Sequence, residues 1–437
     1  MTSKSSNVRR WLLSITLIWV VTGSAMADPK ALDIAEAFLS SVEQGQMAQA
    51  HAMFDDTAAS ALSADRLAAV WSQLADQLGG YRGRGPWRVE QLAGRAVYVT
   101  RLEFAQAALD ARISIDAVGR VDGFRIVPAA PVSEPEAVAG VREIEFKLGG
   151  ELPALLALPE GDGPFPAVVL VHGSGPNDRD QTIGPNRSFR DLAMGLARRG
   201  VASLRYDKRT RVQPERFRDR AYTVQDEVID DVLLAVETLR KRPEIDASRV
   251  GLVGHSLGAM LAPRIAGLID PPPYLLVLLA PPARSLQALV VEQVNHVSAL
   301  DGVIDAEEAQ QLENLRAQAR EATKASPGSA APSLLGLPQS YLADLNAHDP
   351  VQAARRLAIP MLILQGGRDY QVSAERDFAR WREALEDHPD TELVLIDELD
   401  HLFRPGEGPS RPGDYLRPGP AFAPVIDRIA DFLLESR

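Results

Sequence analysis

Hydrophobic and polar residues follow one pattern up to about residue 128 and a different pattern from residue 141 onward. The first block opens with an amphipathic helix at 31–39 and continues as Ala-rich helical sequence to residue 78. Apolar and polar residues then alternate, which predicts strands over 87–90, 96–104, 111–115 and 123–127. Helices followed by strands predict a small α+β domain, with the helices packed on one face of a curved antiparallel sheet.

The second block begins with a predicted hairpin, 143–147 and 152–158, and continues with apolar runs that alternate with helical segments. The runs are uninterrupted, which indicates strands buried on both faces, as in a mostly parallel sheet flanked by helices. The expected strands are 167–171, 201–206, 250–253, 274–279, 361–364 and 393–396. The expected flanking helices are 187–199, 224–240, 257–268, 374–386 and 423–434.

A largely helical insertion at about 285–357 interrupts this alternation. Two amphipathic helices are expected over 285–325, and a further helical stretch over 341–357. We expect the insertion to lie as a cap over the carboxyl ends of the strands, because ligands bind at that edge of open α/β sheets. A surface hairpin without a role in binding is the alternative.

The first 27 residues predict a secretory signal peptide. Lys4, Arg9 and Arg10 precede an uncharged apolar run over 11–26, and a small-x-small site ends at Ala27. We therefore expect cleavage after Ala27 and a periplasmic or secreted protein. The alternative, a membrane anchor, needs about 20 apolar residues, which is more than this run offers, so no stable span is expected after processing. A Pro-rich linker at 131–140 then separates a first domain, 28–130, from a catalytic domain, 141–437.

Composition excludes several kinds of chemistry and partner. The chain has no cysteine, which excludes disulfides and a thiol nucleophile. Its net charge is −12, and removal of the signal peptide, which carries three positive charges, makes it −15. Such an acidic protein gains no electrostatic attraction to nucleic acid or to anionic lipid, so neither is an expected partner.

The sequence Gly254-His255-Ser256-Leu257-Gly258 lies between a predicted strand and a predicted helix. A Gly-x-Ser-x-Gly motif at such a turn holds its serine in a strained backbone conformation with the hydroxyl exposed at the edge of the sheet. Glycine is needed at both flanking positions, because a side chain would collide with the neighbouring strand or helix. Ser256 is therefore the candidate nucleophile.

A serine nucleophile needs an imidazole base that a carboxylate orients. In this architecture the acid follows the serine in the chain and the histidine follows the last strand, which selects Asp369 and His401. Asp397 and Asp400 are competing acids, which we interpret as loop and turn carboxylates. The other histidines are less suitably placed: His51, His172, His255, His296, His348 and His388.

The developing oxyanion needs hydrogen-bond donors. The backbone N–H of Leu257, directly after the nucleophile, is one candidate, and the N–H of Ser174 in the loop His172-Gly173-Ser174-Gly175-Pro176 is the other. No metal and no organic cofactor is implied.

Residues 141–437 resemble a bacterial serine esterase of the α/β-hydrolase superfamily. The resemblance rests on the motif at 254–258 and on the segments 172–180, 183–186 and 205–209. It extends to a subgroup of secreted esterases whose N-terminal domain of unknown function is similar to the cystatin fold, as 28–130 is. It implies hydrolysis of short-chain or aryl carboxylic esters through an acyl-enzyme. Dienelactone hydrolases in this superfamily use a cysteine nucleophile, which this chain lacks.

Alternatives to an esterase remain open from the sequence. The same apparatus serves peptidases and thioesterases, and a binding protein could keep the fold without the chemistry. We expect the first domain to be an interaction or homodimerisation unit. The charged residues after two strands are expected to brace the loops through mutual ion pairs rather than to bind substrate: Asp178, Arg179, Asp180, Asp207, Lys208 and Arg209.

Overall fold

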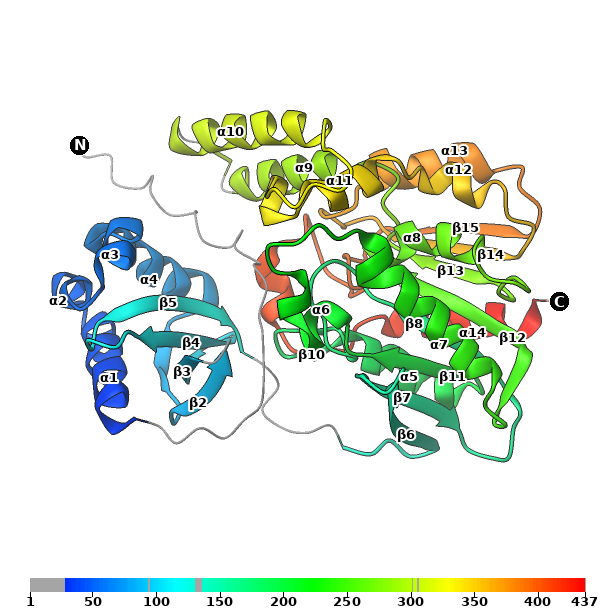
Figure 1. Cartoon of the computed structure of the whole chain (residues 1–437), viewed down its shortest axis with the longest axis horizontal. Coiled ribbons are helices and arrows are strands. Elements are labelled where there is room, and N and C mark those ends of the chain that lie inside the picture. The colour runs from blue at the N-terminus through cyan, green and yellow to red at the C-terminus, as the bar shows by residue number, and fades with distance from the viewer. Residues whose placement is uncertain (1–27, 93–94, 130–135, 301, 305, 437) are drawn as a thin grey trace. The chain divides into compact units, whose positions relative to one another are not determined.

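The computed structural model describes residues 28–436 except 93–94, 130–135, 301 and 305. The described chain divides into two compact units (Figure 1). Unit 1 holds the chain up to Glu134 together with Ile183–Asn186 and Pro412–Pro418, and unit 2 holds the rest. The predicted signal peptide lies outside the described residues, as does part of the predicted linker.

Unit 1 consists of four helices followed by a five-stranded antiparallel sheet. The helices are α1 (Pro29–Glu43), α2 (Met47–Ala52), α3 (Asp56–Ala61) and α4 (Ala64–Leu78). The strands are β1 (Tyr81–Arg84), β2 (Arg88–Leu92), β3 (Arg95–Phe104), β4 (Ala108–Ile115) and β5 (Val121–Pro128). They run in the order β1-β3-β4-β5, and β2 also pairs with β3. This is the predicted α+β arrangement with one more strand, β1.

The core of unit 1 forms where the helices meet the sheet. Phe38 and Leu39 on α1 are fully buried and belong to the same apolar cluster as Leu102 and Ile113 on β3 and β4. Arg101 on β3 and Arg112 on β4 are half-buried and lie between buried residues, which is the part of each strand where the alternation is visible. Strand β1 contains Gly83 at a positive φ of 136°, and it lacks such alternation, so the pattern did not predict it.

Unit 2 is built on an eight-stranded sheet. Its strands are β6 (Val141–Leu148), β7 (Leu152–Pro159), β8 (Phe165–Val171), β11 (Ala202–Tyr206), β12 (Ile245–His255), β13 (Leu276–Leu279), β14 (Met361–Gly366) and β15 (Thr391–Ile396). The order is β15-β14-β13-β12-β8-β11-β7-β6. All neighbours from β15 to β11 are parallel, and the β6–β7 hairpin is antiparallel. Two short strands, β9 (Thr182–Ile183) and β10 (Asn186–Arg187), pair with each other.

Helices cover this sheet (Figure 1). The main ones are α5 (Ser188–Arg198), α7 (Asp230–Arg240), α8 (Leu257–Ala266), α13 (Ala379–Leu385) and α14 (Ala423–Glu435). Shorter helical segments of unit 2 are α6 (Arg209–Val212) and η1 (Pro214–Phe217), whereas η5 (Pro412–Leu416) belongs to unit 1. Two single π-helical turns, η2 (Gln225–Ile229) and η4 (Ala374–Phe378), lead directly into α7 and α13. The predicted flanking helices are all present, but the π-helical turns were not predicted, because periodicity does not distinguish them from α-helix.

The insertion between β13 and β14 is helical, as predicted. It comprises α9 (Leu286–Ser298), α10 (Ala306–Ala322), η3 (Leu334–Gly336), α11 (Gln339–Asn346) and α12 (Pro350–Ala354). The side chain of Gln293 on α9 donates to the carbonyl of Gln371, 2.9 Å away in the segment that follows β14. Arg264 on α8 pairs with Asp344 on α11 at 2.9 Å. The Gln293 contact places α9 at the carboxyl end of the sheet, where a cap is expected, and the Arg264 contact packs α11 against α8.

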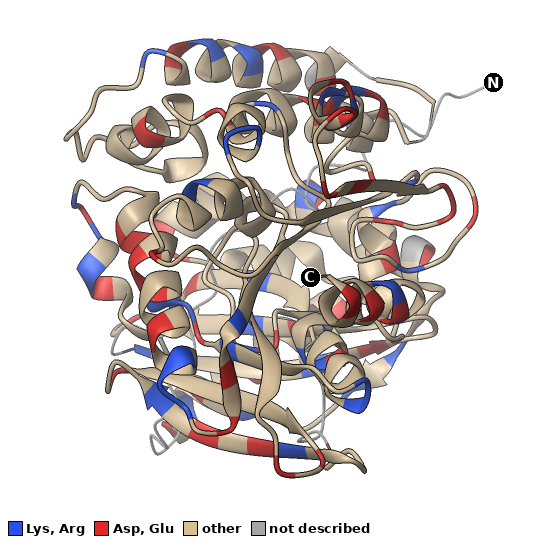
Figure 2. Cartoon of the chain, turned by 90° about the vertical axis from the view of Figure 1, so that its right-hand side faces the viewer, with Lys and Arg blue, Asp and Glu red and all other residues tan. Residues whose placement is uncertain are grey.

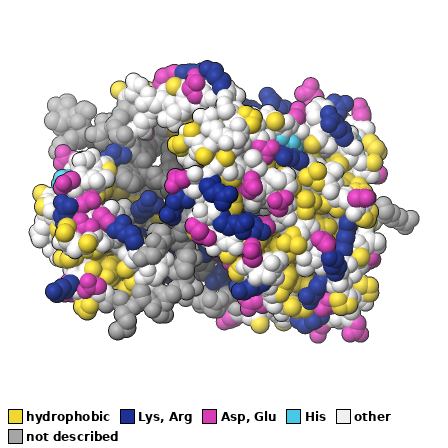
Figure 3. Space-filling model, viewed as in Figure 1, with side chains coloured by type: hydrophobic (Ala, Val, Ile, Leu, Met, Phe, Trp, Pro, Cys, Tyr) yellow, Lys and Arg dark blue, Asp and Glu magenta, His cyan; other side chains and the backbone are white. Residues whose placement is uncertain are grey.

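Charged residues of both signs are interspersed over the faces drawn in Figures 2 and 3. On unit 2 the hydrophobic side chains in Figure 3 are likewise intermingled with charged ones. Within the described ranges, none of the helices combines the length and the apolar character that crossing a membrane requires.

Candidate active site

Ser256 occupies the sharp turn between β12, which ends at His255, and α8, which begins at Leu257. Its φ of 56° is a left-handed value that non-glycine residues rarely adopt. The Ser256 N–H donates to the carbonyl of Leu279 at 2.9 Å, and the Ser256 carbonyl accepts from Met260 at 2.9 Å. These bonds hold the strained turn that the sequence predicted, with a half-buried serine.

Two glycines allow the turn to form. A Cβ at Gly254 would lie 2.5 Å from the carbonyl oxygen of Gly258, at the start of α8. A Cβ at Gly258 would collide with the carbonyl of Val171 at the end of β8. The strand and the helix therefore cross too closely for a side chain at either position, as the sequence motif predicted.

Asp369 and His401 meet after two neighbouring strands. Asp369 Oδ2 lies 2.7 Å from His401 Nδ1, and both residues are buried. The second carboxylate oxygen, Oδ1, accepts the backbone N–H groups of Gln371 at 2.8 Å and Val372 at 2.9 Å. The Gln365 side chain donates to Oδ2 at 3.1 Å. All four contacts present donors to the two carboxylate oxygens, so the Asp369 side chain is held in one orientation.

Glycines also bring these two loops together. A Cβ at Gly366 would collide with the carbonyl of Leu399, and a Cβ at Gly367 would lie 2.7 Å from the Cα of Asp397. The segment after β14 therefore packs directly on the segment after β15. This contact accounts for an acid and a histidine that are 32 residues apart in sequence lying within hydrogen-bonding distance.

His255 connects the serine turn to the histidine loop. Its Nε2 lies 2.9 Å from the carbonyl of His401, and the two imidazole rings are 4.7 Å apart. Among the described residues, no hydrogen bond joins the Ser256 hydroxyl to the His401 ring. Contacts of this kind are often long in unliganded sites and tighten with substrate. The structure thus brings Asp369 and His401 together directly, and places Ser256 next to a residue that contacts the His401 backbone.

The loop with the candidate oxyanion donor lies against the nucleophile, since a Cβ at Gly173 would be 3.3 Å from Ser256 Cβ. The Gly173 N–H donates to Gln181 Oε1 at 3.1 Å, and Gln181 Nε2 lies 2.9 Å from His255 Nδ1. Within the described part of the chain, the backbone N–H groups of Ser174 and Leu257 have no hydrogen-bond acceptor. Both groups are therefore available to an oxyanion.

Gln181, His255 and Gln365 contact the candidate catalytic residues or their loops, and the sequence did not single them out as site residues. Glutamine has no fixed chemical role, and the middle position of a Gly-x-Ser-x-Gly motif is variable. The one signal was the position of His255 beside the nucleophile. The ring nitrogens of His255 accept from Gln181 and donate to the His401 carbonyl, so its neutral form fits this network. Burial, followed by the nearby His401, lowers the pKa of His255 well below 6.5.

The competing candidates have other roles. Asp400 Oδ1 accepts the backbone N–H groups of Leu402 at 2.9 Å and Arg404 at 3.0 Å, so this carboxylate closes a turn. Asp397 is exposed. Burial, together with the positive charge of Lys208, lowers the pKa of His172 from 6.5 to about 3, so this imidazole is a poor base at neutral pH.

The charged residues that follow β8 and β11 hold the loops together, as expected, but most of their partners lie outside this set of six. The backbone N–H of Arg179 donates to Asp207 at 2.8 Å, which is a contact within the set. Asp180 instead pairs with Arg205 at 2.8 Å, and Lys208 pairs with Glu227 at 2.8 Å.

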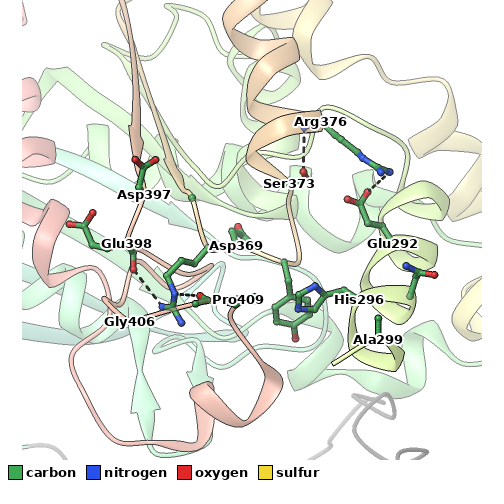
Figure 4. A pocket seen from close by; sticks show the side chains of 15 residues that line it. Glu292, His296, Ala299, Asp369, Ser373, Arg376, Asp397, Glu398, Gly406 and Pro409 are labelled. Atoms are coloured by element: carbon green, nitrogen blue, oxygen red, sulfur yellow. Dashed lines mark hydrogen bonds and ion pairs between the residues drawn. The ribbon is translucent and has the colours of Figure 1, made fainter. Parts of the chain in front are cut away.

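A cavity of about 830 Å³ adjoins the Asp369 side of this arrangement (Figure 4). Glu292 and His296 on α9 line one side together with Ala299, which directly follows α9, and Asp397 and Glu398 line the opposite side. Ser256 and His401 are not among its lining residues. The His296 ring stacks on Tyr370 at 4.9 Å, which gives the cavity a flat aromatic wall.

Across the described residues, no cluster of three or more His, Asp or Glu side chains is arranged to hold a metal ion.

Two parts of the chain match known protein families. Residues 35–124 match a family of unknown function, DUF3887, and residues 168–417 match the alpha/beta hydrolase family. The chain is 38% identical to esterase EstD of Thermotoga maritima over 379 residues, which are 86% of this chain and 88% of that protein.

Solved structures with similar folds are more distant. A structure of ferulic acid bound to Est1E from Butyrivibrio proteoclasticus is 17% identical, with a TM-score of 0.43 over 67% of this chain and 98% of that one. A Mycobacterium tuberculosis puromycin-hydrolyzing peptidase is 19% identical, with a TM-score of 0.45 over 78% of this chain and 46% of that one. Because the family match covers more than half of the sequence, and the match to EstD covers most of both proteins, this chain belongs to the alpha/beta hydrolase family.

Proposed function

We propose that this protein is a serine hydrolase that cleaves carboxylic esters through Ser256, His401 and Asp369. The observation that carries the proposal is the buried hydrogen bond between Asp369 and His401, formed beside a strained serine turn with two available N–H donors. The 38% identity to an esterase over most of the chain supports the choice of ester as substrate.

The geometry suits a two-step acyl transfer. Ser256 Oγ attacks the ester carbonyl while His401 Nε2 takes its proton, and the Nδ1–H bond to Asp369 holds the required tautomer. The N–H groups of Ser174 and Leu257 stabilise the oxyanion. His401 then returns the proton to the departing alcohol, leaving an acyl-serine. Water, deprotonated by His401, attacks the acyl-serine; His401 then returns this proton to Ser256 Oγ as the acid departs, which restores the free hydroxyl.

Short-chain or aryl esters are the proposed substrates. The cavity beside Asp369, which neither Ser256 nor His401 lines, is of the size that binds small organic molecules, and its stacked His296–Tyr370 pair offers a flat surface to an aromatic group away from the reacting carbonyl. These two features support the substrate class.

The experiment is a substrate panel on wild type and Ser256→Ala. We expect hydrolysis of short p-nitrophenyl esters, with much slower cleavage of amino-acid anilides and acyl thioesters. Ser256→Ala should reduce kcat by several orders of magnitude. Preferred cleavage of anilides would identify a peptidase instead, preferred cleavage of thioesters a thioesterase, and full activity in Ser256→Ala would overturn the mechanism.

We further propose that the protein acts in the periplasm or outside the cell after cleavage behind Ala27, and that unit 1 mediates interaction or homodimerisation. The sequence pattern of residues 1–27 supports the first point. N-terminal sequencing of the exported protein tests it, and a mature protein that retains these residues would contradict it. Light scattering on the purified mature chain tests the second, and a monomer at micromolar concentration would contradict dimerisation.

A further inference from the structure

Lys208 is a buried lysine that the proposed reaction does not use. It follows β11, and 2% of the residue is exposed. Its ammonium group donates to two acceptors, the carbonyl of Gly173 at 3.2 Å and Glu227 Oε1 at 2.8 Å. A buried ammonium costs solvation, so its placement against a backbone carbonyl of the oxyanion loop needs a reason.

The Gly173 carbonyl and the Ser174 N–H belong to the same peptide group. In a planar trans peptide the C=O and N–H bonds point in opposite directions, so a donor that holds the oxygen also sets the direction of the N–H. A positively charged donor on the oxygen further polarises the amide, which makes the N–H a stronger donor. Lys208 therefore acts on the Ser174 N–H, one of the two oxyanion donors, through its peptide bond.

A second side chain holds the same carbonyl. Asn177 Nδ2 donates to the Gly173 oxygen at 3.1 Å, and the backbone N–H of Lys208 donates to the Asn177 carbonyl at 3.0 Å. The N–H of Gly173 is itself fixed by Gln181. The Gly173–Ser174 peptide is thus held on its oxygen by two donors and on its N-terminal side by a third contact, while its own N–H stays available.

Glu227, which neutralises Lys208, also contacts the helical insertion. Glu227 lies on the π-helical turn η2, and its Oε2 accepts the Tyr341 hydroxyl of α11 at 2.6 Å. Both partners are buried, and the carboxylate raises the pKa of Tyr341 further above its usual value, after burial itself. Because Glu227 neutralises the ammonium, Lys208 acts by direct contact with the peptide and contributes little long-range field.

We propose that Lys208 is a positioning residue for ester hydrolysis: its ammonium group orients and polarises the Gly173–Ser174 peptide so that the Ser174 N–H stabilises the oxyanion. The proposal rests on the proposed function, because it needs an oxyanion at Ser256. It gives a role in the reaction to a residue whose sequence context indicated loop bracing alone. Glu227 and Tyr341 keep the ammonium in place and connect it to the insertion.

The test variant is Lys208→Met/Glu227→Gln, which removes both charges and so leaves no unpaired buried ion. The matched control is Arg209→Met/Asp231→Asn. It removes the adjacent ion pair, in which Arg209 Nε lies 3.2 Å from the buried carboxylate of Asp231, with no contact to the Gly173 peptide. Thermal unfolding of both variants measures their loss of stability. Asn177→Ala, which removes the second donor at a half-buried side chain, serves if the double variant does not fold.

The assay is hydrolysis of a p-nitrophenyl ester and of its thionoester, whose sulfur accepts hydrogen bonds weakly. For the Lys208 variant we expect kcat on the ester to fall about 10- to 100-fold, less than the 10²- to 10³-fold that loss of a direct oxyanion donor causes. KM should stay within about threefold, and the preference for ester over thionoester should decrease, because that preference reports oxyanion hydrogen bonding. Asn177→Ala should change both quantities in the same direction by a smaller factor.

Equal kcat and equal thionoester discrimination in the Lys208 variant and in the Arg209 control would overturn the proposal and leave a structural ion pair. So would unchanged values in Asn177→Ala if the double variant cannot be purified. Ser256→Ala, assayed alongside, separates this failure from that of the proposed function. If Ser256→Ala is inactive, a negative result concerns Lys208 alone; if it is active, the mechanism and this inference both fail.

Discussion

Replacing Asp369 by asparagine changes one atom and should disable the site. The carboxylate accepts four hydrogen bonds, two at Oδ1 from Gln371 and Val372, and two at Oδ2 from His401 and Gln365. An asparagine has one accepting oxygen. Since two backbone N–H groups cannot turn away, this oxygen takes the Oδ1 position, and the NH₂ group faces His401.

An NH₂ group at that position needs an acceptor, so His401 must carry its proton on Nε2, the nitrogen that has to receive the serine proton. Loss of the correct tautomer in a triad of this kind lowers kcat about 10⁴-fold, which corresponds to ~5.5 kcal/mol of transition-state stabilisation. The NH₂ group also opposes Gln365 Nε2, which cannot rotate because it donates to the carbonyls of Gly366 and Val372. This donor–donor conflict should lower the free energy of unfolding by about 1–3 kcal/mol.

The assay is kcat on p-nitrophenyl acetate, with stability measured by urea denaturation. Asp400→Asn is the matched control, because the Asp400 carboxylate accepts backbone N–H groups at Oδ1 and an amide can keep both bonds. We expect its kcat to stay within about threefold of wild type. Activity of Asp369→Asn above about 1% of wild type, or a larger loss in Asp400→Asn, would refute the assignment of the acid.

Three further predictions concern the supporting structure. Gly258→Ala should fail to fold or lose more than about 3 kcal/mol, because its Cβ meets the Val171 carbonyl, whereas Gly413→Ala, with open space around it, should be stable; equal melting temperatures would contradict this. Gln181→Met should lower the free energy of unfolding by about 1–3 kcal/mol, because the Gly173 N–H and His255 Nδ1 lose their partner; an unchanged urea midpoint would count against that network. The pKa of His172 falls from 6.5 to about 3 on folding. Titration of this group therefore leaves the free energy of unfolding unchanged above pH 6.5 and lowers it by ~1.4 kcal/mol per pH unit as the pH falls from 6.5 toward 3. Denaturation between pH 6.5 and 5 should therefore depend less on pH in His172→Gln than in wild type, and identical slopes would show that His172 takes up its proton in the folded state.

Sequence patterns predicted the sheet of unit 2 because central strands such as β8 and β13 are buried apolar runs that end at recognisable turns. The serine turn was predictable from its two glycines and its position after a strand, because these features indicate that the backbones of strand and helix pack closely. The Asp369–His401 pair followed from chain order and strand ends. Unit 1 was predictable where its strands alternate, and not at β1, where the alternation is absent.

The parts that sequence reasoning missed depend on side chains meeting across the fold. Gln181 and His255 are 74 residues apart, and Lys208 meets Gly173 from 35 residues away. The spacing of hydrophobic and polar residues does not predict such contacts, because each depends on the final positions of loops that follow different strands. The π-helical turn that carries Glu227 was not predicted either, because its hydrophobic pattern does not differ from that of an α-helix.

The most direct measurement is the site of covalent labelling by a fluorophosphonate, mapped by mass spectrometry on the folded protein. We expect one adduct, on Ser256, with a labelling rate that falls by several orders of magnitude in His401→Ala. Ester hydrolysis without an adduct on Ser256, or labelling that is as fast in His401→Ala as in wild type, would contradict a nucleophile activated by that histidine.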